Sequence, residues 1–218
     1  MKNRDQNKKR LCAAAGLLVA FALWTVAVRV LDVRSIGPCG STVGFATLNQ
    51  FIHTLTGVHM MLYTVTDWLG LIPIGTAMGF AVLGLVQWIR RKKISRVDRS
   101  LFVLGGFYLV VIALFVLFEV MVINYRPVLI DGVLEASYPS STTLLVTCVM
   151  PTAAMQLCDR IRNATVRRCV TLVIALFVAF MMIGRLLSGV HWVTDIIGGA
   201  LLSAGLVTLY SFVSKEQR

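Results

Sequence analysis

Six long apolar stretches constrain this chain more than any other feature of its sequence. A helix needs roughly 20 apolar residues to cross the hydrocarbon core of a bilayer, which is about 30 Å thick. Only 14% of the 218 residues are charged, whereas about 25% are charged in a typical soluble domain. The sequence therefore predicts an all-α, polytopic membrane protein that forms a single domain over residues 1–218. The spans are expected at about residues 11–31, 69–89, 101–123, 141–158, 166–184 and 196–213.

The basic residues alternate between the two sides of these predicted spans. On one side, 17 of the 21 Lys and Arg residues fall in segments 1–10, 90–99, 159–168 and 215–218. The connections on the other side hold Arg29, Arg34, Arg126 and Arg185. Because cytoplasmic loops are enriched in Lys and Arg, we expect both termini in the cytoplasm. The net charge of +11 then reflects orientation in the membrane, and no nucleic-acid partner is expected.

The segment 43–66 is less apolar than the six spans and carries several polar side chains. Its apolar residues recur every three or four positions, which is typical of an amphipathic helix. We expect this helix on the outer membrane surface, where it is placed to cover the mouth of a lipid site. His53 and His59 are interpreted as interfacial polar residues, and Trp68 and Trp192 as anchors at the outer interface.

Ionisable residues gather in two connections on the outer side. The first contains Arg126, and the second runs from Arg185 to His191 and Asp195. His191 and Asp195 are four residues apart, so they share one face at the start of a helix. The carboxylate can hold one imidazole nitrogen and leave the other free as a nucleophile, while the arginines bind a phosphate. The same pattern fits a structural His–Asp pair with arginines that contact lipid headgroups, and spacing alone leaves both interpretations open.

Three segments of the sequence resemble the signature motifs of the type-2 phosphatidic acid phosphatase (PAP2) family. Gly184-Arg185-x5-His191-x3-Asp195 is similar to the family's S-R-x5-H-x3-D, Arg126-Pro127 to the end of its K-x6-R-P, and Pro139-Ser140-Ser141-Thr142 to its P-S-G-H. The order of the segments and their placement between spans also agree. The resemblance implies a six-transmembrane-helix bundle that acts as a membrane lipid phosphatase.

The resemblance also implies roles for individual residues. His191 would be the nucleophile that forms a phosphohistidine, and Asp195 would orient it. The phosphate would be bound by Arg126, Arg185, Ser140 and Ser141. The family needs no metal or other cofactor, and none is expected here. The implied partners are a phosphorylated lipid substrate and the lipid bilayer.

Two positions depart from the family motifs. The lysine of the first motif is replaced by Glu119, and the histidine of the second motif by Thr142. That histidine is the general acid of the family, so the usual proton donor to the leaving group is missing. Glu119 is interpreted either as a substitute acid or as a structural charge paired with Arg126 or Arg185.

The absence of the family's general acid affects which substrate is expected. An alkoxide leaving group resembles hydroxide, whose conjugate acid has a pKa of roughly 15.7, and a general acid speeds such a step about 10²–10⁴-fold. A lipid diphosphate instead expels a phosphate monoester, whose second pKa is about 6, so this group leaves as an anion. We therefore favour a lipid diphosphate such as undecaprenyl diphosphate over a monophosphate. The alternative is a catalytically impaired PAP2-like protein that binds or transports a phosphorylated lipid.

The expected location is the cell membrane of a bacterium, with the active site facing the exterior. An impermeant thiol reagent tests this orientation in a background whose five native cysteines are replaced. Cysteines introduced near Asp131 and Gly189 should react in intact cells, and one near Ser95 should react only after lysis. Labelling of the Ser95 site alone in intact cells would reverse the predicted orientation.

Overall fold

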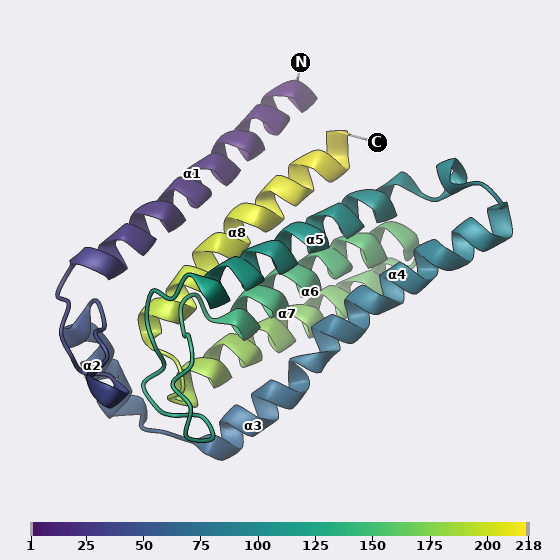
Figure 1. Cartoon of the computed structure of the whole chain (residues 1–218). Coiled ribbons are helices and arrows are strands. Elements are labelled where there is room, and N and C mark those ends of the chain that lie inside the picture. Colours follow the sequence, from purple (N-terminus) through teal and green to yellow (C-terminus); the bar gives the residue numbers. More distant parts are fainter. Residues whose placement is uncertain (1, 217–218) are drawn as a thin grey trace.

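The structure, a computed structural model, describes residues 2–216, with side chains from residue 6 to residue 215. Arg218 and the side chains of Lys2 and Arg4, which contribute to the basic ends counted above, lie outside this part of the chain. Within it the regular structure is helical, and the long helices pack side by side in one bundle (Figure 1). The α-helices are α1 (Lys2–Val30), α2 (Ala46–Thr56), α3 (Met60–Leu69), α4 (Leu71–Arg91), α5 (Arg99–Val120), α6 (Ser141–Arg160), α7 (Ala164–Leu187) and α8 (Val193–Glu216).

Six helical segments of the described chain are long and apolar enough to cross a membrane, which confirms the predicted six-span bundle. They are α1, the pair α3–α4, α5, α6, α7 and α8. Helices α5 to α8 begin and end within three residues of the predicted positions. The second span starts earlier than predicted, at Met60, because α3 continues into α4 through Gly70, whose backbone is itself helical.

The amphipathic helix is present as α2, but it is shorter than the predicted segment 43–66. It ends at Thr56, because Gly57 has a φ of 69°, a conformation that glycine adopts far more readily than other residues. The chain resumes a helix at Met60, so residues 60–66 belong to the second span. Helix α2 lies at the end of the bundle opposite the start of α1 and the end of α8 (Figure 1).

Helix α6 forms the centre of the bundle. In its most apolar stretch 61% of the residues are buried, against 44% in α8 and 6–17% in the other four spans. It contacts α4, α5, α7 and α8. The outer spans present large apolar side chains to the hydrocarbon instead of to one another. Polar groups at the start of α6 are therefore enclosed by protein, away from the lipid.

The loop between α7 and α8 is held against the turn between α2 and α3. His59 N donates to Ser188 O at 3.0 Å, and His53 Nε2 lies 3.1 Å from Gly189 O. A Cβ atom at Gly189 would lie only 2.0 Å from Gly57 O. His53 thus fixes a loop instead of facing the membrane interface, which differs from the expectation. Gly189 is too enclosed to serve as a labelling site, whereas Asp131 lies in an exposed loop.

Replacing Gly189 with alanine should destabilise the protein more than replacing Gly132. Both glycines have a positive φ, which is 68° at Gly189 and 78° at Gly132. Both substitutions therefore strain the backbone by about 1 kcal/mol. A Cβ at Gly132 meets no atom within 4 Å, whereas at Gly189 it collides with the backbone of Gly57. Thermal unfolding of the detergent-solubilised protein should show a fall in Tm of about 2–4 °C for Gly132→Ala and a larger fall for Gly189→Ala. Equal shifts would mean that the contact with Gly57 does not constrain the loop.

Candidate active site

Two connections that are distant in the sequence meet at one end of the bundle, opposite the chain termini. One joins α7 to α8, and the other, residues 121–140, joins α5 to α6. Trp192 Nε1 donates to Tyr125 O at 2.8 Å across their junction, and Trp192 is 3% exposed. Trp192 is therefore part of this junction, and its interpretation as an interfacial anchor was wrong. The junction brings together Arg126, Arg185, His191 and Asp195.

Asp195 supports His191 through Ser137 and not by direct contact. Asp195 Oδ2 lies 3.9 Å from His191 Nδ1, which is too far for a hydrogen bond. Ser137 Oγ lies 3.1 Å from Nδ1 and donates to Asp195 Oδ2. The carboxylate also accepts from Trp192 N at 2.9 Å and from Asn124 Nδ2 at 3.3 Å. The spacing of the sequence therefore predicted the right pair but not the hydroxyl that links it.

The direction of these hydrogen bonds determines the tautomer of His191. Because the Ser137 hydroxyl proton goes to Asp195, its oxygen accepts from His191, and Nδ1 carries the imidazole proton. Nε2 keeps its lone pair and accepts from Arg185 Nη2 at 3.3 Å. Burial, with the charges of Arg126 and Arg185, holds the pKa of His191 well below its usual value of 6.5. At neutral pH His191 is thus an uncharged imidazole, the form in which a histidine can act as a nucleophile.

Two buried guanidinium groups face this imidazole. Arg126 and Arg185 are 8% and 1% exposed. Arg126 Nε lies 3.0 Å from Glu135 Oε2 and Arg185 Nη1 lies 3.6 Å from Asp67 Oδ1, but neither ion pair has hydrogen-bond geometry. The Nε and Nη1 atoms of both arginines have no hydrogen-bond partner among the described residues. Since buried N–H groups are normally paired, this site is suited to an anion that supplies the acceptors.

The segment Pro139-Ser140-Ser141-Thr142 leads into α6. Ser140 is fully buried, where its hydroxyl caps the helix by accepting from Thr143 N at 3.4 Å. Its own N–H donates to Asp195 O at 3.1 Å, so the start of α6 is tied to the loop that carries His191. Ser141 and Thr142 form the first turn, where free N–H groups and the helix dipole favour an anion.

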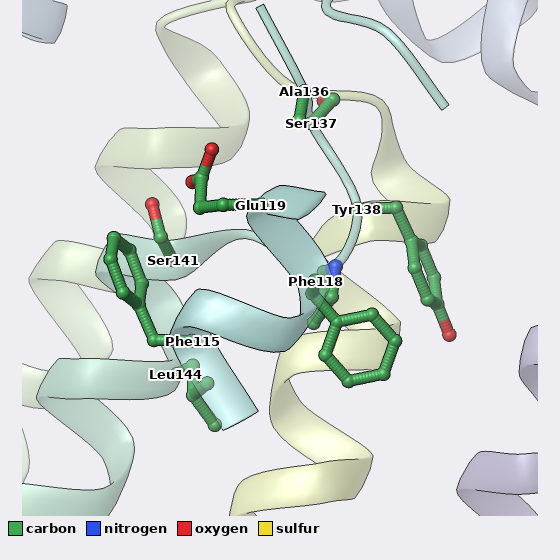
Figure 2. Close-up of a pocket in the computed structure, with 9 residues that line it drawn as sticks. Phe115, Phe118, Glu119, Ala136, Ser137, Tyr138, Ser141 and Leu144 are labelled. Atoms are coloured by element: carbon green, nitrogen blue, oxygen red, sulfur yellow. The ribbon is translucent and has the colours of Figure 1, made fainter. Parts of the chain in front are cut away.

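Glu119 forms no ion pair with either arginine among the described residues. It lies at the end of α5 and lines a narrow recess with Ser137 and Ser141 (Figure 2). The recess has a volume of about 10 Å³, which is enough for about one water molecule. The arginines pair with Glu135 and Asp67 instead. The interpretation of Glu119 as the ion-pair partner of Arg126 or Arg185 was therefore wrong.

A groove of about 570 Å³ lies between α4, α5 and α6, and its lining includes Asp67, the ion-pair partner of Arg185. Ligand sites commonly have volumes of about 300–1,000 Å³. At one end it is lined by Asp67, Ser141 and Thr142, and beyond them mostly by apolar residues. The lining residues Ile74, Met78, Ile112 and Phe115 are exposed on the lipid-facing surface. The groove can therefore take an apolar chain from the bilayer while a charged head lies near Arg185.

Comparisons with known proteins agree with this geometry. Residues 123–218, which hold both arginines, His191 and Asp195, match the PAP2 superfamily. The fold of the chain is similar to the crystal structure of a transmembrane PAP2-type phosphatidylglycerolphosphate phosphatase from Bacillus subtilis, with a TM-score of 0.57 and 19% identity. The alignment covers 94% of this chain and 97% of the other. No curated protein matches the sequence significantly.

Three residues of the candidate site were not found from the sequence: Ser137, Tyr63 and Asp67. The Tyr63 ring covers both guanidinium groups, with its centroid 4.9 Å from Arg185 Cζ and 6.0 Å from Arg126 Cζ. Tyr63 was missed because its segment was assigned to the outer amphipathic helix. Asp67 was missed because the predicted second span began at residue 69, and only the structure places this carboxylate in a membrane span. No feature of the sequence marks Ser137.

Proposed function

We propose that this PAP2 protein is a membrane lipid phosphatase that forms a phosphohistidine at His191. The observation that carries the proposal is the set of unpaired N–H groups on Arg126 and Arg185 beside the free Nε2 of His191. A phosphoryl group supplies the acceptors that these donors lack and presents its phosphorus to the imidazole. The match of residues 123–218 to the PAP2 superfamily and the phosphatase named as a structural neighbour support the same assignment.

The reaction follows from the tautomer and the charges of the site. His191 Nε2 attacks phosphorus, the bond from phosphorus to the leaving oxygen breaks, and the leaving group departs with its electron pair. Positive charge that develops on the imidazole is stabilised by Asp195 through Ser137, while the arginines hold the phosphoryl oxygens. Water then attacks phosphorus, the P–N bond breaks, and inorganic phosphate leaves a neutral His191. Ser140 and Ser141 hold phosphate oxygens at the start of α6 in this scheme.

The groove and Thr142 favour a lipid diphosphate, of which undecaprenyl diphosphate is one example. The apolar length of the groove suits a hydrocarbon chain, and its polar end lies near Arg185 through Asp67. Thr142 lines the same end, where a general acid is expected, and its hydroxyl has no proton to spare at neutral pH. A diphosphate needs no acid there, because its leaving group is already a stable anion.

The site lies at the exterior face in this proposal. It is at the end of the bundle opposite the start of α1 and the end of α8 (Figure 1). The basic segments lie with the chain ends, which the positive-inside rule assigns to the cytoplasm. A substrate on the outer leaflet of a bacterial membrane would then reach His191 directly.

A second candidate is a PAP2-fold protein that binds or transports a phosphorylated lipid without hydrolysing it. The observation that favours it is Thr142, which leaves the site without the acid of the family motif. Phosphate binding by the arginines would persist in such a protein, whereas phosphate release and the phosphoprotein would not form.

The two candidates are separated by phosphate release from lipid diphosphates and monophosphates in detergent micelles. If the phosphatase proposal holds, the unmodified protein turns over and forms an acid-labile, base-stable phosphoprotein, and His191→Ala abolishes both. Asp195→Asn should remain folded and lose up to about 10⁴-fold in rate, the loss expected when a histidine tautomer is no longer held. His59→Ala is the control, because its ring is exposed and hydrogen-bonds to Thr56 O, away from the arginines and His191. Full activity in His191→Ala would exclude the phosphohistidine mechanism.

The leaving-group argument predicts a substrate ratio. The protein should prefer a lipid diphosphate to the matching monophosphate by a wider margin than a PAP2 enzyme with an intact P-S-G-H segment. Thr142→His should narrow the margin by accelerating the monophosphate reaction, by less than the roughly 10²–10⁴-fold that a positioned acid supplies. The gain is limited because Ser141 and Glu119 still differ from the family. Equal rates on both substrates in the unmodified protein would contradict the argument and leave the PAP2 assignment intact.

A further inference from the structure

Asp67 is an acidic side chain of the second span that the reaction described above does not use. It lies near the end of α3 and its side chain is 59% exposed at the polar end of the groove. Its Oδ1 lies 3.6 Å from Arg185 Nη1. A carboxylate in a membrane-spanning segment is costly, and such residues commonly act on a substrate or ion.

Asp67 and His191 lie at different ends of one guanidinium group. Arg185 Nη2 contacts His191 Nε2 at 3.3 Å, and Arg185 Nη1 contacts Asp67 Oδ1 at 3.6 Å. In phosphoryl transfer the attacking and leaving atoms lie roughly in line on opposite sides of phosphorus. A phosphoryl group that Arg185 holds against His191 leaves its other side to the leaving group, and Asp67 lines the groove from which that group would come. The water that hydrolyses the phosphohistidine must approach from this second side.

We propose that Asp67 is the general base that activates this water, an inference that rests on the proposed function. The other groups near the leaving side do not fit the task. Thr142 is too weak a base, and Glu119, which lines the neighbouring recess, forms no ion pair with Arg185 among the described residues. Glu135 pairs with Arg126, which makes no hydrogen bond to His191 in the described chain.

Hydrolysis of the phosphohistidine needs no reactant other than water. The Asp67 carboxylate takes one proton from water as the water oxygen forms a bond to phosphorus. The P–Nε2 bond breaks, and its electron pair returns to Nε2 of a neutral His191. The proton on Asp67 passes to the departing phosphate or to solvent through the groove. Loss of this base should slow only the second half of the reaction, because a lipid diphosphate needs no proton in the first half.

Rapid-quench kinetics of Asp67→Asn with a polyprenyl diphosphate tests the proposal. We expect the first turnover to remain as fast as in the unmodified protein and to end in a burst of one lipid monophosphate per site. Steady-state phosphate release should fall about 10²-fold, within the range of a general base, and the phosphohistidine should accumulate. Asp67→Glu retains a carboxylate and should restore part of the steady-state rate. If Asp67→Asn does not fold, Asp67→Glu carries the test, because it should change the dephosphorylation rate and not the burst.

Two matched variants complete the experiment. Asp131→Asn makes the same chemical change at an exposed residue with a φ of 49°, which asparagine tolerates, and should leave both phases unchanged. Glu119→Gln should also leave the ratio of the two phases unchanged. If Asp67→Asn lowers the burst rate and the steady-state rate equally, Asp67 is a positioning residue for Arg185 and the proposal is overturned. Full activity of Asp67→Asn would overturn it as well. If the unmodified protein gives neither product nor phosphoprotein, the proposed function fails as well.

Discussion

Two arginines buried beside one imidazole are the constraint on which the rest of this site depends. Removing a charge from water costs several kcal/mol unless partners compensate for it. Here the compensation comes from the edges of the site, through Glu135 for Arg126, Asp67 for Arg185 and the Tyr63 ring for both. Unpaired donors remain, and burial together with the surrounding positive charge lowers the pKa of His191. In the proposed function, the same positive charge therefore helps to keep the imidazole nucleophilic and attracts an anion.

The non-helical backbone near the membrane is paired across the site. Arg126 N donates to Glu135 O, Ser137 N to Asn124 O, and Ser140 N to Asp195 O. Such pairing is needed because lipid offers no hydrogen bonds to exposed peptide groups. Each of these bonds also places a residue of the site. The same hydrogen bonds therefore pair the peptide groups of these loops and position the residues of the site.

The sequence predicted the parts of this protein that depend on short-range pattern. The lengths of the apolar stretches predicted six spans, and the spacing of Arg185, His191 and Asp195 around the connection from α7 to α8 predicted the centre of the site. Contacts between distant segments were not predictable in the same way. Ser137 reaches His191 across 54 positions of the sequence, and nothing in its neighbourhood marks it. The break at Gly57 moved α3 from the surface into a span, which brought Tyr63 and Asp67 to the arginines.

The groove between α4, α5 and α6 offers a lipid substrate a route to the site within the plane of the membrane. Its apolar lining opens on the lipid-facing surface, while the turn before α3 closes tightly over the loop of His191 through Gly189. A lipid that uses this route arrives by diffusion in the plane of the membrane, with its tail in the groove before its head meets Arg185. Encounter frequency then depends on the surface density of the lipid and on bilayer viscosity, and not on concentration in the surrounding water. A water-soluble phosphate ester of the same head chemistry would lack this search path.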